Sequence, residues 1–406
     1  MRPSNRLRHQ AFFRLLGESH ELDADWPATA AGLLLLRQLD DRFRDQLMPD
    51  ARSSAATLEA VDAIPATDST RRILLGLAQL AIETEPARHD LGTRLFAWAR
   101  ALENNASWAL AEDVYAAVTE HVPADDDLEV VTDAWMRRGY VARMQSDFDG
   151  ALFAIERGRE LAARLGDASR LLRLRMASAN VAIDRDQPEL AESIIVETVA
   201  LAVPLGGPVL SEALHTRGTV ATLRGDRIAA LQFYHRALDG APSDIGRERL
   251  LLSISGTSID LGARTMARDA LLVLAVTAQT RHTRWLAVVN LLEIAALDRN
   301  ELSFESYRRE LAGEPLSPLV ATYFALYEGH GHRAFGRPDL AAASYARAVQ
   351  QATEHQLPKL LIEAKQATET LWSSPYASHA EAPLPAGLGP LAERVRSMRE
   401  NLPSAR

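Results

Sequence analysis

The chain has 406 residues, of which 47% are hydrophobic and 24% are charged, and its formal net charge is −9. The absence of cysteine excludes disulfides, thiolate metal sites and cysteine nucleophiles, and the negative charge argues against a surface for nucleic acid. No stretch reaches the roughly 18–20 apolar residues that a membrane span needs, so we expect a cytoplasmic protein that does not bind membranes.

Residues 1–90 are predicted to form a helical cap. The basic start, with Arg2, Arg6, Arg8 and Arg14, is interpreted as a solvated arm that leads into an amphipathic helix. Two further amphipathic stretches follow, ATAAGLLLLRQLDDRFRDQL and STRRILLGLAQLAIETE. We expect these helices to cover the apolar end of the helical array that comes after them.

One acidic motif in this region, Asp40, Asp41 and Asp45, resembles the aspartate-rich helices that hold magnesium in all-α prenyl-diphosphate enzymes. The second aspartate-rich helix that those enzymes need is missing. We therefore interpret the three carboxylates as a solvated helix face paired with arginines of the same helix, each pair contributing about 0.2–0.5 kcal/mol.

Residues 211–244 form the clearest of several repeats. The segment SEALHTRGTVATLRGDRIAALQFYHRALDGAPSD predicts two helices joined at Arg224-Gly225-Asp226, because apolar and small residues recur every three or four positions in both halves. The same pattern recurs, clearly or faintly, from positions near 92, 132, 172, 248, 286 and 322, at a spacing of about 36–40 residues.

Equivalent positions of these repeats carry a large residue, then a glycine, and then alanine and a large side chain. Small residues let two helices approach closely, and the larger side chains fill the space toward the next pair. The residues predicted to pack the repeats are Trp135, Gly139, Ala151, Gly218, Ala230, Tyr234, Ala237, Gly329, Ala341 and Tyr345.

This pattern resembles the tetratricopeptide repeat. The long repeats are similar to those in the arrays of large bacterial transcriptional regulators, such as those that control maltose genes. The resemblance implies an all-α, right-handed solenoid of helix pairs over residues 91–372. Residues 373–406 begin with a Pro-, Ser- and Gly-rich stretch and are expected to form a linker and a short helix that folds back on the last repeat.

The resemblance also implies a concave groove lined by the first helix of each pair. The side chains expected to face it are Met136, Tyr140, Arg143, Arg173, Met176, Asn180, His215, Arg249 and Asn290. Arginine can hold a carboxylate through two hydrogen bonds, asparagine can bond an extended backbone, and methionine adapts to varied side chains. The alternative for Met136, Met144 and Met176 is that they fill gaps between helices.

No catalytic or nucleotide-binding motif occurs in the sequence, and His330 and His332, two positions apart on a helix, would point to different sides. We therefore expect no catalytic residue, no cofactor and no metal site. The sequence predicts a scaffold or adaptor that binds a protein or peptide segment. The alternative is a regulatory sensor that binds a small peptide or signal molecule in the same groove, and an all-α enzyme is the least favoured function.

Overall fold

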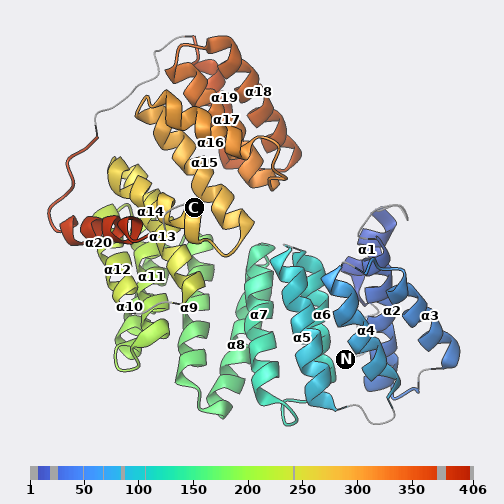
Figure 1. Cartoon of the computed structure of the whole chain (residues 1–406). Coiled ribbons are helices and arrows are strands. Elements are labelled where there is room, and N and C mark those ends of the chain that lie inside the picture. Colours follow the sequence, from blue (N-terminus) through green and yellow to red (C-terminus); the bar gives the residue numbers. More distant parts are fainter. Residues whose placement is uncertain are drawn as a thin grey trace. The chain divides into compact units, whose positions relative to one another are not determined.

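A computed structural model describes residues 8–18, 26–48, 50–66, 68–83, 87–105, 107–240, 243–372 and 381–402. All regular secondary structure among these residues is helical, in helices α1 to α20 (Figure 1). This confirms the all-α class. Arg2 and Arg6 of the predicted basic arm, and the first part of the predicted linker, lie outside the described residues.

Two compact units, Met1–Thr198 and Val199–Arg406, divide the chain within α10 (Pro188–Ala202). The helices of the first unit that precede α10 are α1 (Gln10–Glu18), α2 (Trp26–Phe43), α3 (Ala51–Asp62), α4 (Ser69–Ile82), α5 (Arg88–Asn104), α6 (Trp108–His121), α7 (Leu128–Met144), α8 (Phe148–Leu165) and α9 (Ala168–Asp184). Those of the second unit are α11 (Gly207–Leu223), α12 (Arg227–Asp239), α13 (Asp244–Asp260), α14 (Arg264–Thr277), α15 (Arg281–Leu297), α16 (Glu301–Leu311), α17 (Pro318–Ala334), α18 (Pro338–Glu354), α19 (Pro358–Glu369) and α20 (Gly389–Glu400).

The first helices of the repeats all have the same length. The first helices, α5, α7, α9, α11, α13, α15 and α17, each have 17 residues. They begin 37 to 40 residues apart, close to the repeat starts expected from the sequence. Six of these first helices, α5, α7, α11, α13, α15 and α17, pack against the second helix that follows them.

The turn inside each pair has a recurring backbone conformation. The residue two positions before the second helix is left-handed, with φ of 81° at Gly225 and 72° at Gly336. In three of these turns the next residue, Asp147, Asp226 or Asn300, caps the second helix; Asp226 accepts a hydrogen bond from the Ala229 amide at 3.0 Å. Glycine suits this left-handed position because it lacks a Cβ, and this is the turn predicted at Arg224-Gly225-Asp226.

The tightest contact within a pair joins a glycine of the first helix to a large side chain of the second. A Cβ added at Gly218 would collide with the Tyr234 ring, and one at Gly329 would collide with the Tyr345 ring. A Cβ at Gly139 would lie 2.9 Å from Ile155 Cγ1. The alanines of these contacts, Ala151, Ala230, Ala237 and Ala341, are fully buried.

Helices α1 to α4 cover the first repeat. Helices α1 and α2 pack against α6, and α4 packs against α5. Buried side chains close this end, with the Phe12 and Trp98 ring centroids 5.7 Å apart. Helix α3 was not expected from the sequence, because ARSSAATLEAVD contains few large apolar residues; Asp50 caps it by accepting a hydrogen bond from the Ser53 amide.

The C-terminal helix α20 packs against α14 and α12 within the second unit (Figure 1). The expectation that it folds back on the last repeat is therefore wrong. Its apolar side chains Leu388, Leu391 and Val395 are buried on this surface, and acidic residues of α12 and α14 attract its arginines. The helix α19, which follows the last pair and packs against α18, was also not expected.

Candidate functional site

Arg143, one of the predicted groove residues, joins two first helices of the first unit. Its Nη1 donates a hydrogen bond to Asp184 Oδ2 at 2.6 Å, which connects α7 to α9. Its guanidinium also lies 5.5 Å from the centre of the Tyr140 ring, and that ring lies 6.0 Å from the Trp108 ring. Because Asp184 already balances its charge, Arg143 would bind a ligand carboxylate only in exchange for Asp184 or together with it.

The remaining predicted residues of this unit differ in accessibility. Met176 is only 4% exposed, so it fills the space between helices instead of facing a ligand. Met136 is half-buried and packs against an apolar cluster, whereas Met144 is exposed. Arg173 and Asn180 are half-buried on α9, and Arg173 already has a polar or electrostatic partner.

His215 and Arg249, predicted from different repeats, lie close together in the second unit. His215 Nε2 is 2.9 Å from Ser253 Oγ, and its ring lies 5.6 Å from the Tyr234 ring. Burial, and to a smaller extent the charge of Arg249, lowers the pKa of His215 to about 4. His215 is therefore a neutral hydrogen-bonding group between α11 and α13 at neutral pH.

Aromatic rings follow one another along α17. The ring of Tyr327 lies 5.5 Å from that of Tyr323 and 5.8 Å from that of His330, which in turn lies 5.7 Å from Tyr345. On the preceding first helix, Asn290 donates a hydrogen bond to its own backbone at Leu286, at 2.6 Å. Asn290 is therefore held in place, with part of its donor capacity used.

Two carboxylates that we did not predict, Glu293 on α15 and Glu363 on α19, complete this surface. Burial and the negative charge of Glu363 raise the pKa of Glu293 to about 8, although a hydrogen bond with Tyr327 acts in the opposite direction. Burial also raises the pKa of Glu363. Within the described parts of the chain, neither carboxylate has an ion-pair partner. Glu293 is the single acidic residue in the apolar run WLAVVNLLEIAAL, a signal that the sequence did contain.

Helix α19 also carries both lysines of the chain, Lys359 and Lys365. Both side chains are exposed. The positive charge elsewhere on the repeats is therefore arginine.

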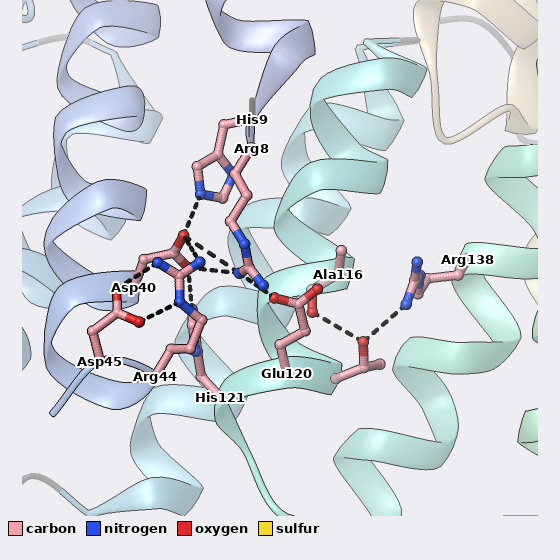
Figure 2. Close-up of polar contacts among 10 residues, drawn as sticks. Arg8, His9, Asp40, Arg44, Asp45, Ala116, Glu120, His121 and Arg138 are labelled. Atoms are coloured by element: carbon pink, nitrogen blue, oxygen red, sulfur yellow. Dashed lines mark hydrogen bonds and ion pairs between the residues drawn. The ribbon is translucent and has the colours of Figure 1, made fainter. Parts of the chain in front are cut away.

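Asp40 does not lie on a solvated face, as we expected from the sequence; it is 5% exposed. Figure 2 shows four basic side chains around it. His121 Nε2 lies 3.0 Å and His9 Nε2 3.4 Å from its carboxylate, with Arg8 Nη1 at 3.3 Å and Arg44 Nη1 at 3.1 Å. Burial alone would raise the pKa of Asp40, but the hydrogen bonds from His121 and His9 and the nearby positive charges hold it well below its usual range.

Of the three aspartates that we predicted to be solvated, only Asp41 and Asp45 are exposed. Arg8, expected on a solvated arm, contacts Asp40 and also Glu120 Oε2 at 2.5 Å (Figure 2). This cluster joins the start of the chain to α2 and α6, and we interpret it as structural.

The two neighbouring histidines on α17 contact different helices. The ring of His330 faces Tyr345 on α18, whereas the ring of His332 lies 5.8 Å from Phe304 on α16. Over the residues that the structure describes, no group of three or more side chains is arranged to hold a metal ion. Nor does any helix there have both the length and the apolar character needed to cross a bilayer.

The stacked helix pairs and the glycine–ring contacts show an α-helical repeat protein built from helix pairs. Among solved structures, it is similar to a Rap protein complexed with competence and sporulation factor, with 9% sequence identity, a TM-score of 0.36, and coverage of 86% of this chain and 98% of that one. A likeness this distant carries no conclusion about ligand or activity. No protein-family model matches the sequence, and no curated protein matches it.

Proposed function

We propose that this protein is a non-catalytic scaffold that binds a protein or peptide segment along its first helices. The observation that carries the proposal is a set of half-buried polar and aromatic side chains on first helices of the second unit: His215, Asn290, Glu293 and Tyr323. Polar groups are costly to remove from water unless they gain hydrogen-bond partners. His215 and Asn290 already have one partner each, so a segment with its own backbone and side-chain polar groups would use their remaining hydrogen-bonding capacity.

The surface formed by α15, α17 and α19 favours a basic segment. A lysine or arginine of the partner would neutralise Glu293 and Glu363 at the same time, which relieves the repulsion between them. The half-buried ring of Tyr323 lies beside Glu293 and offers a face for a cation.

The test begins with peptides selected on the full chain from a displayed random library. We expect the selected peptides to be enriched in lysine or arginine. Glu293→Gln should weaken their binding by about 1–3 kcal/mol, because hydrogen bonds to charged groups fall in that range. Glu354→Gln, the same chemical change at an exposed position of the second helix α18, is the matched control. Equal binding by wild type and Glu293→Gln would contradict the proposal.

The raised pKa of Glu293 gives this binding a characteristic dependence on pH. Free Glu293 is largely protonated at pH 7, and a cationic ligand favours the ionised form, so binding should release a proton. We expect affinity for a basic peptide to increase between pH 6 and about pH 9, and calorimetry in buffers of different ionisation heat to show proton release. Glu293→Gln should remove most of the pH dependence of the affinity. If the pH dependence persists in this variant, another group releases the proton.

A regulatory sensor, the function implied by the resemblance to the bacterial regulators, would use the same groove. A sensor should bind a free peptide as tightly as the same peptide within a folded protein, and the bound peptide should alter helix protection beyond the contact site. Hydrogen exchange with and without the selected peptide distinguishes the two functions.

A further inference from the structure

The C-terminal residues 381–402 lie against the second helices α12 and α14, outside the groove described above. Leu388, Leu391 and Val395 follow the spacing of one helix face, and their exposed fractions are 1%, 1% and 0%. Figure 1 shows α20 beside α12 and α14 in the same unit. The outer face of these two helices therefore already carries an amphipathic helix.

Charged groups fix the register of this helix. Arg399 Nη1 donates a hydrogen bond to Asp269 Oδ1 at 2.6 Å, and Asp269 is only 3% exposed. At the other end of the contact, Arg394 pairs with Asp239 and donates a hydrogen bond to the Leu238 carbonyl at 3.0 Å. Two of the three arginines of α20, Arg394 and Arg399, thus meet carboxylates that belong to the array.

The segment before α20 completes the N-terminus of α14. The N-cap residue Ala263 has no side chain that can accept a hydrogen bond. Glu381 supplies the missing carboxylate, with its Oε1 accepting from the Thr265 amide at 2.6 Å and its Oε2 from Thr265 Oγ1 at 2.8 Å. A carboxylate at this position is stabilised by the helix dipole and satisfies an otherwise orphan amide. Ala382 adds a backbone hydrogen bond to the Gly262 carbonyl.

The contact between α14 and this segment is incompletely filled. A cavity of about 340 Å³ lies between α14 and the segment, lined among others by Met266, Leu384 and Arg396. Side chains beside a cavity lose part of their packing contacts. Residues 381–402 should therefore detach from α12 and α14 more readily than the two helices of a pair separate from each other.

We propose that the outer face of α12 and α14 is a docking surface for an amphipathic helix, and that residues 381–402 are its intramolecular occupant. The partner that exchanges with them is a helix with apolar residues at the spacing of Leu388, Leu391 and Val395 and with arginines on its flanks. The surface offers this partner an apolar strip, two carboxylates and, once Glu381 is displaced, the free N-terminus of α14.

The test uses a fluorescent synthetic peptide with the sequence of residues 381–402. In the full chain, Arg394→Glu with Arg399→Glu places like charges against Asp239 and Asp269 and should release the chain's own segment. The tethered segment competes at an effective concentration of about millimolar, so we expect the peptide to bind this double variant at least tenfold more tightly than wild type. Arg157→Glu with Arg159→Glu, a matched pair of exposed arginines on α8, should bind the peptide as wild type does.

A charge exchange locates the binding surface. Asp239 is 62% exposed, so Asp239→Arg should leave folding intact. Combined with Arg394→Ser and Arg399→Glu, so that the chain's own segment cannot pair with the new arginine, it should weaken the wild-type peptide severalfold, and a peptide carrying Arg394→Asp should recover the loss. If the affinity of the peptide is unchanged by Asp239→Arg in the chain and by Arg394→Asp in the peptide, the peptide binds elsewhere and the proposal is wrong.

Hydrogen exchange on the wild-type chain supplies a test that needs no variant. We expect amides of residues 389–400 to exchange faster than those of 264–277. If the two helices exchange at the same slow rate and the double variant gains no peptide binding, α20 is an integral part of the fold and the docking surface does not exist. The groove variant Glu293→Gln should not alter peptide binding, which separates this result from the proposed function.

Discussion

Asp40 shows how one buried charge can hold together segments that are distant in the sequence. Its four basic neighbours come from the start of the chain, from the turn that follows α2 and from α6. Its pKa is depressed in the folded protein, so at acidic pH the unfolded chain binds more protons than the native one. The stability that Asp40 contributes is therefore present above the ordinary aspartate pKa of about 3.9 and is lost as pH falls below it.

We expect Asp40→Asn to lower the free energy of unfolding of the first unit by about 1–3 kcal/mol, since it removes the charged acceptor that the buried rings of His9 and His121 contact. Urea unfolding at pH 7 measures the loss, and a series from pH 6 to pH 3 should show a shallower acid dependence than wild type. Asp41→Asn, the same change at the exposed neighbouring residue, should stay within about 0.5 kcal/mol of wild type. Similar effects of the two substitutions would disprove the role assigned to the cluster.

The burial of Asp40 could not be predicted from its surroundings in the sequence. His9 and His121 are far from it along the chain, and no local periodicity records such a contact. Glu293 is a different case, because a lone carboxylate in an apolar helix is visible in the sequence. Its neighbours Tyr327 and Glu363 come from later helices, so its raised pKa was not visible.

At the level of helices, the contact between Gly218 and Tyr234 sets how closely α11 and α12 approach. In Gly218→Ala the added methyl group would lie against Tyr234 Cε1, at a distance too short for two carbon atoms. The Tyr234 ring or the two helices must therefore shift. We expect a loss of about 1–3 kcal/mol, the usual cost of overpacking. Thermal unfolding followed by circular dichroism measures it.

Gly256 is the matched control for this substitution. It also lies inside a first helix, α13, but a Cβ there would meet nothing within 4 Å. Gly256→Ala should therefore stabilise the protein by about 0.5–1 kcal/mol through helix propensity alone. The interpretation fails if both substitutions change the melting temperature in the same direction.

Helix pairs were predictable because their contacts are local and repeat. Gly218, Ala230 and Tyr234 recur at fixed offsets, and each pair closes within about 40 residues. The docking site of α20 was not predictable, although its amphipathic pattern was. An apolar face shows that a helix needs a partner, and here the partners α12 and α14 lie more than a hundred residues earlier.

On the scale of the whole molecule, the division into two units predicts how damage spreads. Ala230 is fully buried between α11 and α12. Ala230→Asp would bury an unpaired charge, which destabilises by about 3–5 kcal/mol when a buried ion lacks its partner. Repeat proteins are stabilised largely between neighbours, so we expect hydrogen exchange to accelerate in α11 to α14 while helices α1 to α8 keep their protection. An unchanged melting temperature, or equal loss of protection in both units, would contradict this account.

The position of Lys359 and Lys365 on α19 has a practical consequence for experiments. Apart from the amino terminus, amine-reactive reagents can modify the chain on this one helix alone, which also carries Glu363 of the proposed groove. A dye or cross-linker is therefore placed beside the candidate binding surface without mutation. Because the chain has no cysteine, one introduced thiol provides a second, independent attachment point, so a single substitution allows energy transfer between two dyes to follow α19.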